Sequence, residues 1–218
     1  MNLTAPCLLP EVARLPTSWF ARSPREVAVD LLGCSLVRVR DDGAILRGTI
    51  VETEAYLGPR DRAAHSFGGR RTSRNESMYA RGGTAYVYFT YGMHFCFNVV
   101  CGEIDDPVAV LIRALEPTHG IADMRAARLS RRRAAPLQAS DLCSGPGKIC
   151  QALQIDRSLD GIDLSSDPRL FVTPGAQQPG TSHITNAARV GVDYAGEWAK
   201  RKLRWYLTQS PHVSRRGC

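Results

Sequence analysis

The 218-residue chain is 44% hydrophobic and 22% charged with a net charge of +7, which is typical of a globular protein that meets a polyanion. No apolar run approaches the roughly 20 residues that cross a bilayer, and the first residues, MNLTAPCLLPEVAR, lack a secretion signal, so we expect a cytoplasmic protein without a membrane segment. Seven cysteines, an odd number without a CxxC pair, argue against a disulfide framework or a zinc site and predict reduced thiols.

The first part of the chain is predicted to hold one helix and a β-hairpin. Residues 1–18 show little periodicity, so we expect an irregular arm before a single domain over 19–214. Ser23-Pro24-Arg25-Glu26 has the cap, proline and glutamate of a helix start, and Gly33 marks the end of that helix. The runs SLVRVR and AILRGTIVETEAYL follow as strands joined at Asp-Asp-Gly.

Residues 57–83 are rich in Gly, Arg, Ser and Asn and predict a long loop, which in a compact domain is usually functional or disordered. Within it, 60–81 holds six arginines against two acidic residues, and five arginines without an acid lie at 125–133. Guanidinium groups bind phosphate bidentately, so both clusters suit a polyanion. A solvated helix face is the alternative for the second cluster, and codon bias can explain why only three of the 28 basic residues are lysines.

The rest of the chain predicts further strands and two helices. TAYVYFTYGMHFCFNVV reads as a strand pair that turns at Tyr91-Gly92, and VAVLIRALEP, ITNAARVGVDY and RKLRWYL as single strands. GIADMRAARLSRRR and GPGKICQALQI are predicted helices, the second starting at Ser144 and Pro146. We therefore predict one mixed α/β (α+β) domain around a curved antiparallel β-sheet, with a protruding β-hairpin and peripheral helices.

Two places in this pattern suggest chemistry. Strand alternation puts Glu52, Glu54 and Tyr56 on one face, which is either the wet face of an edge strand or the wall of a cleft. Tyr91 stands where the chain reverses, and turn tips face solvent. An exposed aromatic beside an arginine-rich loop suits a wedge between stacked bases, whereas core packing is the ordinary alternative.

Several motifs follow one another along the chain: VETEAYLG, AAHSFGGR and TSRN, then GTAYVYFTYGMHFCFN, VLIRALEP and LCSGPGKICQAL, and finally AARVGV and AGEWA. Together, from about residue 17 to 214, they resemble the alkyladenine (3-methyladenine) DNA glycosylase family. The resemblance implies a base-excision-repair hydrolase that acts on double-stranded DNA containing damaged purines. It would flip the damaged nucleotide out of the duplex and hydrolyse its N-glycosidic bond.

The resemblance also implies catalytic roles. Glu54 looks like the general base that activates water, with Arg113 and the backbone carbonyl of Val190 helping to hold that water. Glycosidic cleavage passes through an oxocarbenium-like state that a nearby carboxylate stabilises. An alkylated purine already carries positive charge as it leaves, so one carboxylate suffices, whereas no acid for a neutral base such as hypoxanthine can be named. Because Glu52 lies about 6–7 Å further along the strand from Tyr56, we expect Glu52→Gln to be mild beside Glu54→Gln.

The same resemblance implies binding residues. The flipped base would be sandwiched by Tyr56, His65 and Tyr88, and Asn98 would exclude the 2-amino group of guanine. Tyr91 would fill the gap in the duplex. Contacts to the DNA backbone would come from Thr72, Arg74, Met78, Arg157 and Gly191. Arg157 stands where the family leads us to expect a lysine, which keeps the charge and changes the geometry.

Other interpretations stay open at this stage. The turn at 144–148, which ends in Lys148, could present amides and a cation to a phosphate, or could be an ordinary helix cap. All three lysines lie outside the pocket motifs, so we expect no Schiff-base lyase activity. The absence of a metal-ligand cluster or phosphate-cofactor loop predicts no cofactor, and we expect a monomer. A non-catalytic binder of damaged DNA and an RNA- or nucleotide-processing hydrolase are the competing functions.

Overall fold

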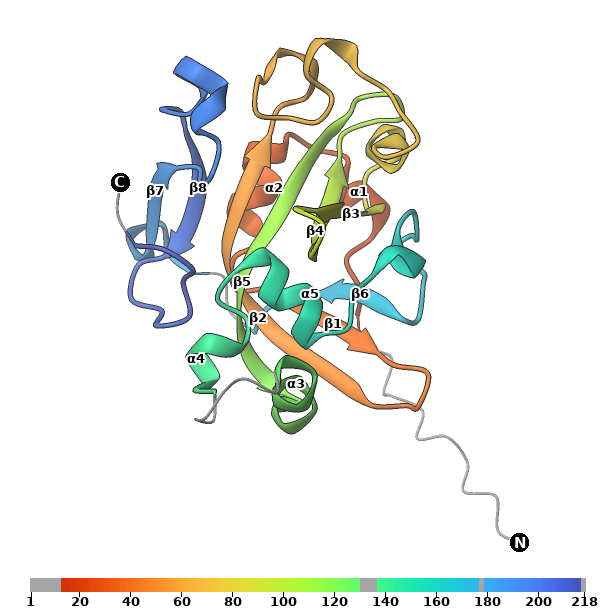
Figure 1. Cartoon of the computed structure of the whole chain (residues 1–218), viewed down its shortest axis with the longest axis vertical. Helices are drawn as coiled ribbons and strands as arrows, with labels where there is room; N and C mark the ends of the chain where they lie inside the picture. Colours follow the sequence, from red (N-terminus) through yellow and green to blue (C-terminus); the bar gives the residue numbers. More distant parts are fainter. Residues whose placement is uncertain (1–12, 130–136, 177–178, 217–218) are drawn as a thin grey trace, which may run out of the picture.

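The computed structural model of the chain describes residues 13–129, 137–176 and 179–216, and its centre is one antiparallel β-sheet (Figure 1). The strands follow the path β3-β4-β5-β2-β1-β6, while β8 pairs with β2 and β7 pairs with β8. Their bounds are β1 Ser35–Val39, β2 Ile45–Tyr56, β3 Ala85–Thr90, β4 His94–Cys101, β5 Val108–His119, β6 Leu170–Thr173, β7 Ile184–Ala188 and β8 Lys202–Leu207. The predicted mixed α/β domain around an antiparallel sheet is confirmed.

Strand β2 is the spine of this sheet. One edge pairs with β5 over residues 47–56, and the other edge pairs first with β1 at residues 45–49 and then with β8 at residues 52–54. The β2–β5 register shifts at Gly48 and on both sides of Glu52. Such bulges bend a strand and increase its twist, which lets β2 leave β1 and meet β8. Residues 52–54 are therefore internal to the sheet.

Helix α2 (Pro24–Asp30) covers one face of β2. The Ser23 side chain caps it by accepting a hydrogen bond from the amide of Arg25, as the sequence predicts. The helix ends at Asp30, shortly before Gly33, which has a positive φ of 86°. The buried hydroxyl of Thr53 donates to the carbonyl of Ala28 at 2.7 Å and ties the helix to the strand.

The chain joins the sheet earlier than the expected irregular arm suggests. The amide of Leu15 donates to the carbonyl of Val172 in β6, and α1 (Thr17–Phe20) follows directly. Residues 1–12 of that arm lie outside the described part of the chain. Strand β6, which we did not predict from the sequence, supplies the backbone acceptor that fixes this N-terminal segment.

Three further helices lie together (Figure 1). They are α3 (Ile121–Arg128), α4 (Ala139–Leu142) and α5 (Pro146–Ala152). Helix α5 lies on β4 and β5, α4 lies on β5, and α3 lies against α4 and α5. The residue before α5 is Gly145 and not Ser144, whose hydroxyl accepts from Lys148 instead. The second arginine cluster is described only in part, because 130–133 lie outside the described residues.

The long segment 57–83 contains no strand or α-helix, and its three short 3-10 turns are Gly58–Arg60, Phe67–Gly69 and Glu76–Tyr79. The predicted loop is thus confirmed. The five cysteines in the described residues, Cys34, Cys96, Cys101, Cys143 and Cys150, are all free and buried. Over the same residues, no helix is long and apolar enough to cross a membrane.

Candidate active site

The chemically interesting residues meet in a cavity of about 270 Å³ between the sheet, the loop 57–83 and the segment after β7. Several predicted residues line it, from four separate parts of the chain: Tyr56, His65, Met78, Tyr88, Tyr91, Asn98, Arg113, Val190 and Gly191. Residues that the sequence analysis did not assign to a pocket complete the wall, notably Tyr86, Cys96 and Tyr194. The cavity is therefore aromatic with a few polar groups, as in many small-molecule sites.

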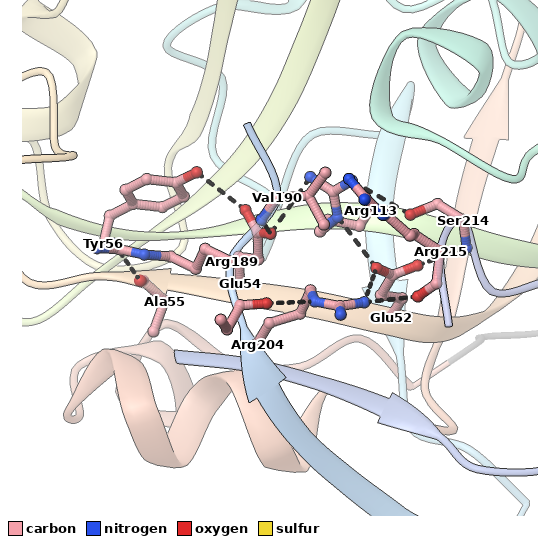
Figure 2. Close-up of polar contacts among 11 residues, drawn as sticks. Glu52, Glu54, Ala55, Tyr56, Arg113, Arg189, Val190, Arg204, Ser214 and Arg215 are labelled. Atoms are coloured by element: carbon pink, nitrogen blue, oxygen red, sulfur yellow. Dashed lines mark hydrogen bonds and ion pairs between the residues drawn. The ribbon is translucent and has the colours of Figure 1, made fainter. Parts of the chain in front are cut away.

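Glu54 lies directly behind this wall with no exposed surface. Its Oε1 accepts from the amide of Val190 at 2.8 Å and lies 3.3 Å from Nη1 of Arg113, while its Oε2 accepts from the Tyr56 hydroxyl at 2.9 Å (Figure 2). All three partners line the cavity. A buried carboxylate that accepts several hydrogen bonds is fixed in place at the cavity wall.

Glu52 is also completely buried, so the wet-face interpretation of this strand is wrong. Its Oε1 accepts from Nε of Arg113 at 3.1 Å and from Nη1 of Arg204 at 3.0 Å, and its Oε2 accepts from the amide of Ser214 at 2.6 Å (Figure 2). The physical reason is the sheet order. Because β2 runs between β5 and β8 here, Glu52 meets Arg113 of β5 and Arg204 of β8, and Glu54 meets Arg113.

Arg113 on β5 connects the two carboxylates. Its Nε faces Glu52, its Nη1 faces Glu54, and its Nη2 donates to the hydroxyl of Ser214 at 3.2 Å. Burial lowers the pKa of Arg113, but the charges of Glu54 and Glu52 outweigh that effect and leave the pKa above its ordinary value. The guanidinium is thus a permanent cation at the cavity wall.

Tyr56 is held from behind by a second buried ion pair. Arg189 lies over its ring, with the guanidinium carbon 4.8 Å from the ring centroid. Nη1 and Nη2 of Arg189 donate to Oδ2 and Oδ1 of Asp61 at 2.5 and 2.8 Å, and neither side chain is exposed. Asp61 also accepts from the amides of Leu57 and Ala63, so it fixes the start of the loop 57–83.

An aromatic group forms another part of the cavity. The His65 ring meets Tyr88 edge to face, with centroids 4.5 Å apart, and its Nδ1 lies 2.8 Å from the hydroxyl of Tyr86. Burial, followed by the charges of Arg74 and Arg70, lowers the pKa of His65 to about 4. The ring is therefore neutral near pH 7, with one nitrogen donating and the other accepting. Asn98 on β4 is buried and donates to the carbonyl of Tyr86.

The β3–β4 hairpin carries Tyr91 at its tip. Tyr91 is 82% exposed, and the carbonyl of Thr90 accepts from the amide of Met93, which closes the turn. Tyr91 and Gly92 have positive φ angles of 52° and 65°, as a tight hairpin turn of the right twist requires. Tyr91 is thus no core residue, and the core-packing alternative does not apply.

The residues expected at the DNA backbone fall into two groups. Thr72, Arg74, Arg157 and Gly191 are all exposed, and Arg74 donates to the carbonyl of Phe89 at the start of the hairpin turn. Met78 differs, because only 2% of its surface is exposed and its side chain lines the cavity. Its side chain therefore faces the pocket and not the outer surface.

Residues 18–211 of the sequence match the family model of methylpurine-DNA glycosylase (MPG), which covers most of the chain. The human DNA-3-methyladenine glycosylase is 47% identical over 206 residues, which are 93% of this chain and 68% of that protein. A putative 3-methyladenine DNA glycosylase of Bacillus cereus (strain B4264) is 42% identical over 203 residues, which are 92% of this chain and 98% of that protein.

This chain belongs to the methylpurine-DNA glycosylase family.

Membership in the methylpurine-DNA glycosylase family agrees with the order of motifs along the sequence. The chain spans 61% of the length of the DNA-3-methyladenine glycosylase of Mus musculus, with which it is 46% identical, so the mammalian relatives have further sequence outside the shared part. Across the residues that the structure describes, no three His, Cys, Asp or Glu side chains gather as a metal site would require.

Sequence reasoning missed some cavity residues of this methylpurine-DNA glycosylase family member. Tyr194 is 71% exposed at the cavity and its hydroxyl donates to the carbonyl of Ala63. It follows the AARVGV motif by two residues, and its place beside the loop 57–83 depends on a contact across 131 positions. Tyr86 belongs to the aromatic run on β3, but strand alternation alone does not tell a core face from a cavity face.

Proposed function

We propose that this protein is a monofunctional DNA-3-methyladenine glycosylase that excises alkylated or deaminated purines in base excision repair. The lesions are of the 3-methyladenine, 7-methylguanine and hypoxanthine class. The observation that carries the proposal is the position of Glu54, a buried carboxylate fixed by three residues that all line an aromatic cavity. A carboxylate beside a base-sized aromatic pocket is the arrangement that N-glycosidic hydrolysis needs.

In the proposed mechanism the damaged nucleotide leaves the duplex and its base enters the cavity between Tyr56, His65 and Tyr88. Glu54 deprotonates water for attack on the sugar carbon, and its negative charge stabilises the oxocarbenium-like state. Arg113 and the Val190 carbonyl orient that water. A cationic base stacks favourably on tyrosine rings, at about 0.5–2 kcal/mol per ring, which favours alkylated purines over normal ones.

Binding outside the pocket uses the exposed hairpin and loops. Tyr91 enters the gap that the flipped nucleotide leaves. Inside the cavity, Asn98 disfavours the 2-amino group of an unmodified guanine, whereas the cationic ring of 7-methylguanine offsets this contact by stacking on the tyrosines. Arg74 and Arg157 supply charge for the phosphates, with Thr72 and Gly191 contacting the backbone and Met78 shaping the pocket wall behind them. The protein works without a cofactor, as a monomer, in the cytoplasm at the nucleoid of a bacterium or in the nucleus of a eukaryote.

One experiment separates this function from non-catalytic binding. The protein is incubated with a duplex that contains hypoxanthine at one labelled position, and hot alkali then converts any abasic site into a strand break. We expect a break at the lesion only. A duplex that is bound but gives no break would identify a binding protein, and release from single strands alone would favour an RNA- or nucleotide-processing hydrolase.

A further inference from the structure

Glu52, which lies on β2 two residues before Glu54, binds directly to Arg113. Glu52 has no exposed surface, and one of its oxygens accepts from Nε of Arg113 at 3.1 Å. The same guanidinium reaches Glu54 with Nη1 at 3.3 Å. Arg113 is therefore fixed at two different nitrogens. The position of its Nη1 depends on the hydrogen bond between its Nε and Glu52.

Ser214 adds hydrogen bonds to both Glu52 and Arg113. The amide of Ser214 donates to Oε2 of Glu52 at 2.6 Å, and the hydroxyl of Ser214 accepts from Nη2 of Arg113 at 3.2 Å. Glu52 and Ser214 are thus hydrogen-bonded to each other. Glu52 binds Nε of Arg113, and Ser214 binds Nη2. Figure 2 shows Arg113 between Glu54 on one side and Glu52 with Ser214 on the other.

Among the described residues, the cluster pairs two carboxylates with two guanidinium groups. Arg204 on β8 is buried and donates from Nη1 both to Glu52 at 3.0 Å and to the carbonyl of Arg215 at 2.8 Å. Two carboxylates therefore face two guanidinium groups. If Glu52 were missing, Arg113 would have only Glu54 as an anionic partner, and the two cations would repel each other.

We propose that Glu52, together with Ser214, is a positioning residue that holds the Arg113 guanidinium against Glu54 at the cavity wall. This inference rests on the proposed function and deepens it, because Arg113 is the residue that orients the attacking water there. The strand pattern led us to expect a mild effect of Glu52→Gln, whereas the positioning role predicts a clear loss of activity. A displacement of a catalytic group by about 1 Å can lower a rate by about 100-fold, so the orientation of Arg113 matters directly for turnover.

The test uses single-turnover base release with excess full-length enzyme on a 7-methylguanine duplex, together with anisotropy for duplex binding. Glu52→Gln replaces one carboxylate oxygen by an NH₂ group. This group donates, and it would face either the arginine donors or the amide donor of Ser214. We expect it to lower the release rate by about 10- to 100-fold, while duplex binding changes by less than about threefold. An unchanged rate in the folded variant would overturn the proposal.

A double-variant cycle asks whether Glu52 acts through Arg113. If it does, Glu52→Gln has no further effect once Arg113→Gln has removed the guanidinium, so the double variant releases base within about twofold of Arg113→Gln alone. The double variant also restores the charge balance, so its melting temperature should recover while its rate does not. Multiplied rate losses, or a rate that recovers together with the melting temperature, would contradict the positioning role.

Ser214→Ala keeps the proposal testable if the Glu52 variants fail to fold. It removes only the hydroxyl that accepts from Arg113, and we expect about a three- to tenfold lower release rate with unchanged binding. The matched control is Ser210→Ala in the same segment, whose hydroxyl accepts from the amide of His212 and does not contact Arg113. Equal rates for the two variants would overturn the role of Ser214. If wild-type protein releases no base, the proposed function fails instead.

Discussion

The hydroxyl of Tyr56 donates a 2.9 Å hydrogen bond to Oε2 of Glu54, so an aromatic wall of the cavity and the buried carboxylate behind it form one unit. Burial, and next the charge of Glu54, raise the pKa of Tyr56 well above its ordinary value near 10. The phenol therefore stays protonated and donates throughout the physiological pH range. Tyr56 can both stack on a base and fix the orientation of Glu54.

Replacing Tyr56 by phenylalanine separates these two roles. The ring remains, but Glu54 loses a donor, and a hydrogen bond to a charged group is worth about 1.5–3 kcal/mol. We expect Tyr56→Phe to lower the single-turnover release rate by about tenfold and to leave affinity for a lesion duplex nearly unchanged. Tyr79→Phe is the matched control, since its hydroxyl donates to the Arg70 carbonyl outside the cavity lining. Equal rates for the two variants would refute the coupling.

Tyr91 is expected to contribute to duplex binding through its exposed ring. Stacking of an aromatic side chain on a base is worth about 1–3 kcal/mol. Tyr91→Ala should therefore weaken affinity for a lesion duplex by about 10- to 100-fold, as measured by fluorescence anisotropy at fixed salt. Ile104→Ala serves as control, because Ile104 is also a large exposed hydrophobic residue, at 66%, and does not line the cavity. Undiminished affinity of Tyr91→Ala would remove its wedge role.

His65 makes the stability of the fold depend on pH. Its pKa falls from 6.5 to about 4 on folding, so between these values the unfolded chain binds a proton that the folded protein does not. Unfolding then takes up a proton, and the free energy of unfolding falls as the pH drops from 6.5 toward 4. The difference in unfolding free energy between wild type and His65→Gln should shrink by up to about 3 kcal/mol across this window. Urea denaturation at several pH values measures it, and parallel curves would contradict the buried neutral ring.

The buried pair of Asp61 and Arg189 is expected to be important for stability. Removing one partner of a buried, hydrogen-bonded ion pair costs about 3–5 kcal/mol, because the other charge is left without compensation. Asp61→Asn should lower the free energy of unfolding by that amount in urea denaturation. The exposed pair of Lys200 and Glu197 offers the control, with 76% and 84% of the side chains accessible. Glu197→Gln should leave the free energy of unfolding nearly unchanged, because exposed ion pairs contribute little to stability. Equal losses of stability in the two variants would contradict the importance of the buried pair.

The sequence allowed the main strands and the long loop to be predicted, because their signals are local. Alternating apolar residues mark β2 and the β3–β4 pair, and glycine, serine and arginine mark the segment 57–83. Strand β6 and helix α4 have only four residues each, which is too short for a clear period. Their positions depend on tertiary contacts such as that between Leu15 and Val172.

The environment of the two glutamates could not be predicted from the strand that carries them. A period of two assigns Glu52 and Glu54 to one face, but burial depends on what covers that face. The covering groups of Glu52 lie 61, 152 and 162 positions away, in Arg113, Arg204 and Ser214. A bulge at Glu52 and the arrival of β8 bring them there. These long-range relationships leave no pattern in a short window of sequence.

The most direct test of the central claim is single-turnover base release by Glu54→Gln on a duplex with one 7-methylguanine. The substitution keeps the shape of the side chain and removes its charge and its capacity to deprotonate water. We expect the release rate to fall by at least about 100-fold, the range of general-base catalysis, while affinity for the lesion duplex stays within about threefold of wild type. Release at the wild-type rate would contradict the role of Glu54 and with it the proposed mechanism.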